Sequence, residues 1–293
     1  MKHSRILLIF LIGISIFFGS LFWGSNLLIY PPSSGFIENI PDKDAVAFSC
    51  LNPLGQKIHA WWYPGKPNSG AIILCHGHGV NHRLTGDMMP FLRKAGFSLL
   101  LFDFRSHGLS DGSYTGIGLN EWEDIDAVIR EAQNRSLLTA SMSLAAFGRS
   151  MGAASLINGS GRLSRIHAFI LESSFAELRS IAANDFIGMT SIPDNPFIDL
   201  SIWFSEKRTG INYRENKPMN HIHEIGSRPV MLIHDSLDRR ATREQHDKLA
   251  SRVPHARILI VPGAGHVQAH KIASATFERE ILTFLASAGM LLE

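Results

Sequence analysis

The sequence has few cysteines, no long basic run and no repeated segment. Cys50 and Cys75 are the two cysteines among 293 residues, too few for a disulfide framework or a zinc site built on thiolates. The count alone allows one disulfide, but Cys75 ends an apolar run typical of a buried strand, which favours two free thiols. The net charge is +2, and without Lys2 and Arg5 the basic and acidic residues balance, so we expect no nucleic-acid partner. With 45% hydrophobic residues, the composition is that of a globular protein rather than a disordered or fibrous one.

Charge is also absent from the front of the chain, where residues 6–37 include no acid or base. Residues 6–30 are mostly apolar, and about 20 such residues suffice to cross a bilayer. The run exceeds the roughly 7–15 apolar residues of a cleavable signal peptide, and it ends without a clear cleavage site. We therefore expect residues 1–30 to form an uncleaved signal-anchor, a transmembrane helix. A cleaved signal peptide and a buried soluble helix are the alternatives.

Lys2 and Arg5 precede the apolar run, so the positive-inside rule places the N-terminus in the cytoplasm. The protein is then membrane-anchored and single-pass with its catalytic domain on the extracytoplasmic side, or secreted if the signal is cleaved. We expect residues 31–44 to be a linker, and a chain without residues 1–30 to stay soluble and active. The sequence gives no sign of the oligomeric state.

The rest of the chain alternates short apolar runs with segments of helical periodicity. Several runs are unbroken, which is typical of strands buried on both faces. The alternation predicts an α/β fold over residues 45–293, with a mostly parallel, doubly wound sheet of eight strands. In such sheets ligands bind beyond the C-terminal ends of the strands. The candidate strands are Val46–Leu51, Lys57–Tyr63, Ala71–Cys75, Ser98–Phe102, Leu144–Phe147, His167–Leu171, Pro229–His234 and Ile258–Val261, and the candidate helices are Trp122–Asn134, Gly152–Ser160, Arg243–Arg252 and Lys271–Ala288.

One segment, about residues 173–228, is too long for an ordinary connection. It has helical stretches, Phe175–Phe186 and Ile198–Lys207, and it is broken by prolines. We interpret it as an inserted helical cap over the strand ends. Its many apolar residues are either ordinary packing or the wall of an apolar substrate site, and both can hold.

The strongest chemical motif is Gly148-Arg149-Ser150-Met151-Gly152, which lies between a candidate strand and a candidate helix. A serine in the middle of G-x-S-x-G sits on a tight strand-to-helix turn, which presents its oxygen at the top of the sheet. The positive end of the following helix lies close by. Ser150 is therefore the candidate nucleophile, and a plain helix N-cap is its alternative role.

A serine hydroxyl needs an adjacent base to become a nucleophile. His266 lies in a Gly-rich loop directly after the last candidate strand and is the candidate base, with His270 as its competitor. A carboxylate should orient the imidazole. Asp238, a few residues past another strand, is the candidate. Asp235, which we expect in a turn, and Glu172 are the alternatives.

The oxyanion of a tetrahedral intermediate requires hydrogen-bond donors. The backbone N–H of Met151 is one candidate, because it follows the nucleophile. The second is the N–H of His78, or of Gly77, in the Gly-rich loop after an earlier strand. His76 and His78 could instead bind a metal, but no carboxylate or third histidine lies near them in sequence. We therefore expect no metal and no cofactor.

These motifs resemble those of the α/β-hydrolase superfamily in identity and chain order, across nearly all of residues 45–288. His76–Gly79 looks like the oxyanion loop, and Gly263–His266 looks like the histidine loop. Asp103–Ser110 resembles the D-x-R-x-x-G-x-S segment, whose Asp and Arg usually brace loops near the site. The cap and Leu171–Phe175 resemble a membrane-anchored, lysophospholipase-, esterase- or acyl-peptidase-like subset.

Two residues depart from the family pattern. Arg149 stands where histidine is commoner, and Asp235 stands where glycine usually precedes the acid. The resemblance implies hydrolysis of an ester, thioester or amide through an acyl-enzyme, without a cofactor. The residues imply the same chemistry, and an apolar cap with a membrane anchor suggests a small-molecule, lipid-like or acylated substrate. A serine peptidase for short or acylated peptides, and a catalytically dead membrane-tethered binding protein, are the alternatives.

Overall fold

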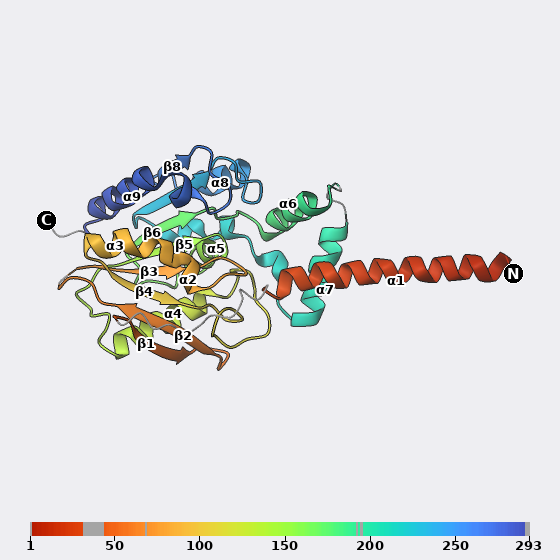
Figure 1. Ribbon diagram of the computed structural model, residues 1–293, viewed down its shortest axis with the longest axis horizontal. Coiled ribbons are helices and arrows are strands. Elements are labelled where there is room, and N and C mark those ends of the chain that lie inside the picture. Colours follow the sequence, from red (N-terminus) through yellow and green to blue (C-terminus); the bar gives the residue numbers. More distant parts are fainter. Residues whose placement is uncertain (1, 32–43, 68, 192, 194–195, 291–293) are drawn as a thin grey trace.

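The computed structural model describes residues 2–31, 44–67, 69–191, 193 and 196–290. A central sheet is covered by helices, and one long helix, α1 (Lys2–Ile29), projects away from it (Figure 1). Apart from its two end residues, the predicted linker of residues 31–44 lies outside the described residues.

The sheet has eight strands in the order β1-β2-β4-β3-β5-β6-β7-β8. β2 pairs antiparallel with β1 and β4, and all other pairs are parallel. This confirms the predicted α/β fold with a mostly parallel, doubly wound sheet. The strands are β1 (Val46–Leu51), β2 (Lys57–Tyr63), β3 (Ala71–Cys75), β4 (Ser98–Phe102), β5 (Leu144–Arg149), β6 (Ala168–Glu172), β7 (Val230–Asp235) and β8 (Arg257–Val261).

Both faces of the sheet are buried, which explains the unbroken apolar runs. Alternate residues of β3 point to opposite faces: Ile73 belongs to the core beside α4 and α5, whereas Ile72 belongs to the core beside α3 and α9. The helices after α1 are α2 (His82–Thr85), α3 (Met89–Ala95), α4 (Trp122–Asn134), α5 (Met151–Asn158), α6 (Leu178–Thr190), α7 (Phe197–Thr209), α8 (Arg243–Ala250) and α9 (Ala269–Ser287).

The two cysteines are free thiols, as the sequence favoured. Cys50 lies on β1 and Cys75 on β3, and two strands separate them in the sheet. Neighbouring strands are about 4.8 Å apart, so these residues are roughly 14 Å apart, well beyond the reach of a disulfide.

α6 and α7 form the cap, inserted between β6 and β7 (Figure 1). Their existence agrees with the sequence, but α6 begins at Leu178 rather than at Phe175. The backbone of Ser173 has a positive φ of 52°, and Glu177 is extended, so the chain cannot be helical directly after β6.

α1 is long and apolar enough to cross a membrane by length and composition, with a mean hydropathy of 2.5 over Arg5–Ile29. Most of the side chains of α1 are exposed on the protein, as expected for a helix whose apolar surface contacts lipid. Its last turns differ, because Leu21, Ser25 and Ile29 are buried on one face. That face packs against the cap helix α7. The end of α1 is thus part of the folded domain rather than a separate tether.

Candidate active site

Ser150 occupies the sharp turn between β5 and α5. Its backbone has φ 51° and ψ −115°, a region that non-glycine residues rarely adopt. A Cβ at Gly148 would lie 2.6 Å from the backbone nitrogen of Ala153, and a Cβ at Gly152 would collide with the carbonyl of Cys75. The turn therefore requires glycine on both sides of the serine, as G-x-S-x-G provides. The N–H of Ser150 is anchored to the Glu172 carbonyl at 2.9 Å.

His266 lies five residues after the end of β8 and reaches back to the serine. The loop bends at Gly263, whose φ is 78°. Nε2 of His266 lies 2.9 Å from Ser150 Oγ, within hydrogen-bond reach, and Nδ1 lies 2.7 Å from Asp238 Oδ2. The structure thus brings together the three side chains that the sequence selected.

Asp238 is held as a carboxylate by its neighbours. Burial opposes its ionisation, but the hydrogen bonds it accepts outweigh burial and lower its pKa below the ordinary value. One oxygen faces His266, and the other accepts the backbone N–H groups of Arg240 and Ala241, each at 2.9 Å. The carboxylate is therefore fixed in position and charged, as required to orient an imidazole and stabilise its protonated form.

The two alternative carboxylates serve elsewhere. Asp235 is not in a turn, which corrects our expectation, because it is the last residue of β7 and is fully buried. It accepts the hydroxyl of Ser173 at 2.7 Å, and burial together with the negative charge of Glu172 raises its pKa to about 7. Glu172 accepts Nε of Arg149 at 2.8 Å. Among the described contacts, neither carboxyl is hydrogen-bonded to His266.

The competing histidine also lies apart from the nucleophile. His270 is near the start of α9, and its Nε2 lies 2.9 Å from Glu278 Oε1. Across the described residues, no group of three or more His, Cys, Asp or Glu side chains is placed to hold a metal ion.

The loop after β3 passes beside the nucleophile. A Cβ on Gly77 would lie 3.5 Å from the Cβ of Ser150. His78 and Met151, the two predicted oxyanion donors, line a small cavity of about 50 Å³ together with Ser150. The His78 ring is buried, and burial lowers its pKa to about 3. The ring lies near the Leu27 carbonyl of α1, and among the described residues neither ring nitrogen has a hydrogen-bond partner.

The segment after β4 makes the loop contacts that the resemblance implies for its Asp and Arg. The carboxylate of Asp103 accepts the N–H of His82 at 2.8 Å and the N–H of Leu109 at 2.9 Å. Arg105 binds Asp124 with Nη2 to Oδ1 at 2.7 Å. These buried pairs tie the connections after β3 and β4 to α4.

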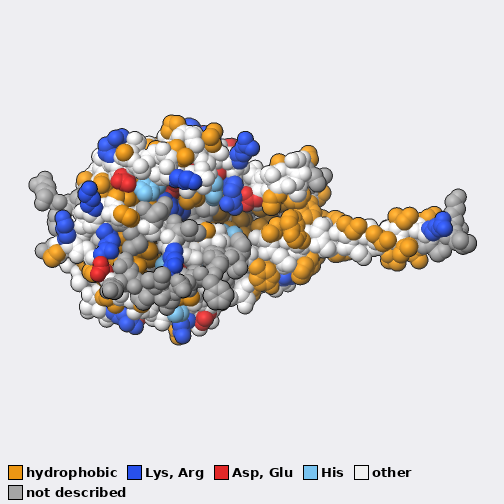
Figure 2. Space-filling model, in the orientation of Figure 1, with side chains coloured by type: hydrophobic (Ala, Val, Ile, Leu, Met, Phe, Trp, Pro, Cys, Tyr) orange, Lys and Arg blue, Asp and Glu red, His pale blue; other side chains and the backbone are white. Residues whose placement is uncertain are grey.

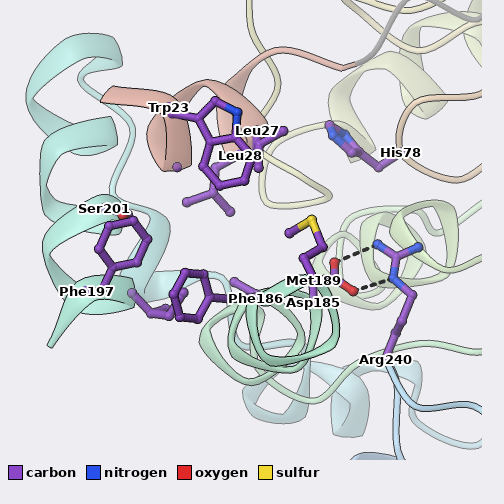
Figure 3. Close-up of a pocket in the computed structure, with 13 residues that line it drawn as sticks. Trp23, Leu27, Leu28, His78, Asp185, Phe186, Met189, Phe197, Ser201 and Arg240 are labelled. Atoms are coloured by element: carbon purple, nitrogen blue, oxygen red, sulfur yellow. Dashed lines mark hydrogen bonds and ion pairs between the residues drawn. The ribbon is translucent and has the colours of Figure 1, made fainter. Parts of the chain in front are cut away.

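The sequence names the cap as a possible wall of an apolar substrate site, but it gives no sign that α1 completes that wall. A cavity of about 340 Å³ lies beside the first one, between α1, α6 and α7 (Figure 3). Leu27 and Leu28 of α1 line both cavities, and so do Asp185 and Arg240, which form a two-point ion pair at 2.6 and 2.8 Å. An apolar N-terminal run gives no sequence signal that it packs against α7, where the bonded residues Ser25 and Ser205 are 180 positions apart.

The sheet order, the strained serine turn and the Ser–His–Asp contacts define an α/β-hydrolase. The family described as serine aminopeptidase, S33 (Hydrolase_4) matches residues 66–260. The chain belongs to this family, and it is a hydrolase.

Three known proteins illustrate the relationship. YfhR of Escherichia coli K12 is 26% identical over 272 residues, covering 90% of this chain and 87% of that protein. The membrane protein YNL320W of Saccharomyces cerevisiae is 26% identical over 170 residues, covering 55% of this chain and 59% of that protein. The solved esterase PF2001 of Pyrococcus furiosus has a TM-score of 0.73 at 23% identity, covering 89% of this chain and 98% of that one. This last likeness shows the shared fold.

Proposed function

We propose that the protein is a serine hydrolase that cleaves a carboxylic ester or thioester of an acylated, lipid-like substrate through an acyl-enzyme on Ser150. The observation that carries the proposal is the continuous relay from Ser150 Oγ to His266 at 2.9 Å and from His266 to Asp238 at 2.7 Å. The strained turn that exposes Ser150 to the cavity supports the same role.

In the first half-reaction, Ser150 Oγ attacks the substrate carbonyl while Nε2 of His266 takes the hydroxyl proton. Asp238 accepts the hydrogen bond from Nδ1 and stabilises the imidazolium that forms. The oxyanion is bound by the N–H groups of Met151 and His78, each contributing about 2.7–4 kcal/mol to transition-state stabilisation. His266 then gives its proton to the leaving alcohol or thiol.

In the second half-reaction, water replaces the leaving group. His266 removes a proton from water, the resulting hydroxide attacks the acyl-serine carbonyl, and the proton returns to Ser150 Oγ as the carboxylic acid departs. The same two N–H groups stabilise the second oxyanion. The cycle uses residues of this chain and water alone.

The proposal includes a single membrane span, with the N-terminus in the cytoplasm and the catalytic domain on the extracytoplasmic side. The length and hydropathy of Arg5–Ile29 support a span, and the yeast relative is named a membrane protein. The basic residues before the apolar run support the orientation. The packing of the last turns of α1 into the domain favours retention of the helix over its cleavage.

A serine peptidase is the second candidate, because the family description names an aminopeptidase. Such an enzyme must bind the free amine of a peptide with an unpaired carboxylate near the nucleophile. Asp185 is the carboxylate that lines both cavities, and it is already paired with Arg240. We therefore rank ester or thioester hydrolysis first.

A fluorophosphonate probe tests the proposal in the full chain. We expect the probe to label the wild-type protein and Ser155→Ala, a control serine one turn along α5, but not Ser150→Ala. We also expect hydrolysis of p-nitrophenyl butyrate but not of aminoacyl p-nitroanilides. Absence of labelling in the wild type would indicate a catalytically dead binding protein, and preferred cleavage of the anilides would indicate a peptidase.

A further inference from the structure

The end of α1 is fixed onto the cap helix α7 by close polar contacts. The Ser205 hydroxyl donates to Ser25 Oγ at 2.9 Å, and Nη1 of Arg208 donates to the same oxygen at 2.8 Å. A Cβ at Gly24 would lie 2.8 Å from Ser201 Oγ, so the glycine lets the two helices approach. These contacts set the position of α1 relative to the cap.

The docked end of α1 forms one wall of the cavity of about 340 Å³. Its apolar walls include Leu27 and Leu28 from α1, Phe186 and Met189 from α6, and Phe197 from α7 (Figure 3). Without α1, one side of the cavity would be open. The volume is at the small end of the roughly 300–1,000 Å³ of ligand pockets.

The apolar cavity leads to the nucleophile. The smaller cavity, which contains Ser150, shares Leu27, Leu28, His78 and Ala182 with it. An acyl chain lying in the larger cavity would thus have its carbonyl end in the smaller one. Because the larger cavity is near the lower size limit of ligand pockets, we expect it to hold one acyl chain.

The cavity lies at the depth where a bilayer would end. A span of about 20 residues that begins at Ile6 crosses roughly 30 Å and ends near Ser25. Large apolar side chains remain exposed there, with Trp23 48% exposed on α1, Met189 59% on α6 and Trp203 43% on α7. Hydrophobic side chains gather over the cap at the base of the projecting helix (Figure 2). Tryptophan is enriched at membrane interfaces.

We propose that the acyl chain of the substrate binds in the cavity between α1, α6 and α7 and enters it from the adjacent bilayer leaflet. The substrate class is a single-chain acyl ester or thioester dissolved in the membrane, and α1 is a wall of its binding site as well as an anchor. This inference rests on the proposed hydrolase function, since it assigns the substrate and entry route of the same site.

The first test fills the cavity in the full chain, reconstituted in phosphatidylcholine vesicles. Met189→Trp adds bulk inside the cavity, and Ile187→Trp is the matched control, because Ile187 is also exposed on α6 but does not line the cavity. We expect Met189→Trp to lower kcat/KM for p-nitrophenyl dodecanoate at least about tenfold more than kcat/KM for p-nitrophenyl butyrate. The control should change neither.

The second test moves α1. Gly24→Leu forces the helix away from Ser201, whereas Gly19→Leu is a matched control, because a Cβ at Gly19 has nothing within 4 Å. We expect Gly24→Leu to reduce the ratio of dodecanoate to butyrate hydrolysis at least about fivefold while fluorophosphonate labelling persists. The control should keep the wild-type ratio.

The entry route is tested by diluting the dodecanoyl ester with phosphatidylcholine at constant bulk concentration. We expect the initial rate to follow the mole fraction of ester in the vesicle, and a rate set by bulk concentration alone overturns the bilayer route. If both test variants keep the chain-length ratio of their controls while labelling persists, the acyl site is wrong and the hydrolase proposal stands. If the wild type is neither labelled nor active, both proposals fail.

Discussion

The sheet and the α1–cap region build their parts of the site by different means. In the sheet, Ser150, Asp238 and His266 follow the ends of the parallel strands β5, β7 and β8, so all three lie at the C-terminal ends of the strands. In the α1–cap region, the walls of the larger cavity come from helices that meet through side-chain packing and side-chain hydrogen bonds. Strand order thus places the Ser–His–Asp side chains, whereas the docking of α1 on the cap encloses the larger cavity.

The largest expected effect compares the two carboxylates at the end of β7. Asp238→Asn cannot orient His266 as the carboxylate does, so we expect kcat to fall about 10³–10⁴-fold. Asp235→Asn leaves the triad contacts in place and should cost less than about tenfold. Kinetics on p-nitrophenyl butyrate measure both. A large loss of kcat in Asp235→Asn with a small loss in Asp238→Asn would show that Asp235, and not Asp238, is the acid of the triad.

Next in size is removal of α1 in two lengths. Deletion of residues 1–20 leaves the buried turns, whereas deletion of residues 1–30 removes Leu21 and Ile29 from the core. Burial of two such side chains contributes about 3–5 kcal/mol, so we expect Tm to fall by roughly 10 °C only in the longer deletion. The longer deletion should also abolish hydrolysis of p-nitrophenyl dodecanoate. Differential scanning fluorimetry and the ester panel measure both effects.

Equal behaviour of the two deletions would show that α1 is only a tether. The sequence alone predicts such a tether, because an apolar run of this length is typical of an independent membrane segment. The structure revises it through buried contacts that no local pattern encodes.

The sequence predicts the sheet and its serine turn better than it predicts the contacts between α1 and the cap. The strand boundaries and the serine turn were predictable, because each depends on local periodicity or on glycines at fixed spacing. The turn preference of aspartate predicts a turn at Asp235, but its buried hydrogen bond with Ser173 joins residues 62 positions apart. The contact of Ile29 with the domain was missed for the same reason: its carbonyl accepts the N–H of Thr115. Such pairings depend on the assembled fold.

The buried Asp235 carboxyl should give the folded core a pH dependence. Its pKa is raised to about 7, so the folded state holds this proton above pH 4 while the unfolded state has lost it. Its contribution to stability is therefore complete at low pH and is lost as pH rises toward 7. We expect the wild type to lose about 2–3 kcal/mol more than Asp235→Asn between pH 5 and pH 8. Urea unfolding at both pH values checks this, and parallel curves would contradict it.

The smallest expected effect comes from a substitution at the contact between α1 and α7, here called the junction. Arg208 binds Ser25 Oγ and Asn26 Oδ1, each at 2.8 Å, and its guanidinium lies 4.5 Å from the ring centre of Phe22. Since these contacts join α7 to α1, Arg208→Ala should cost about 1–2 kcal/mol of stability and lower the Tm of the full chain in detergent micelles by a few degrees. Lys207→Ala, an exposed neighbour on the same helix, is the control. In the chain without residues 1–30 the Arg208 substitution should lose most of its effect, because its partners on α1 are gone and the Phe204 ring remains. A persistent loss there would mean that Arg208 stabilises α7 alone, and the junction would depend on apolar packing.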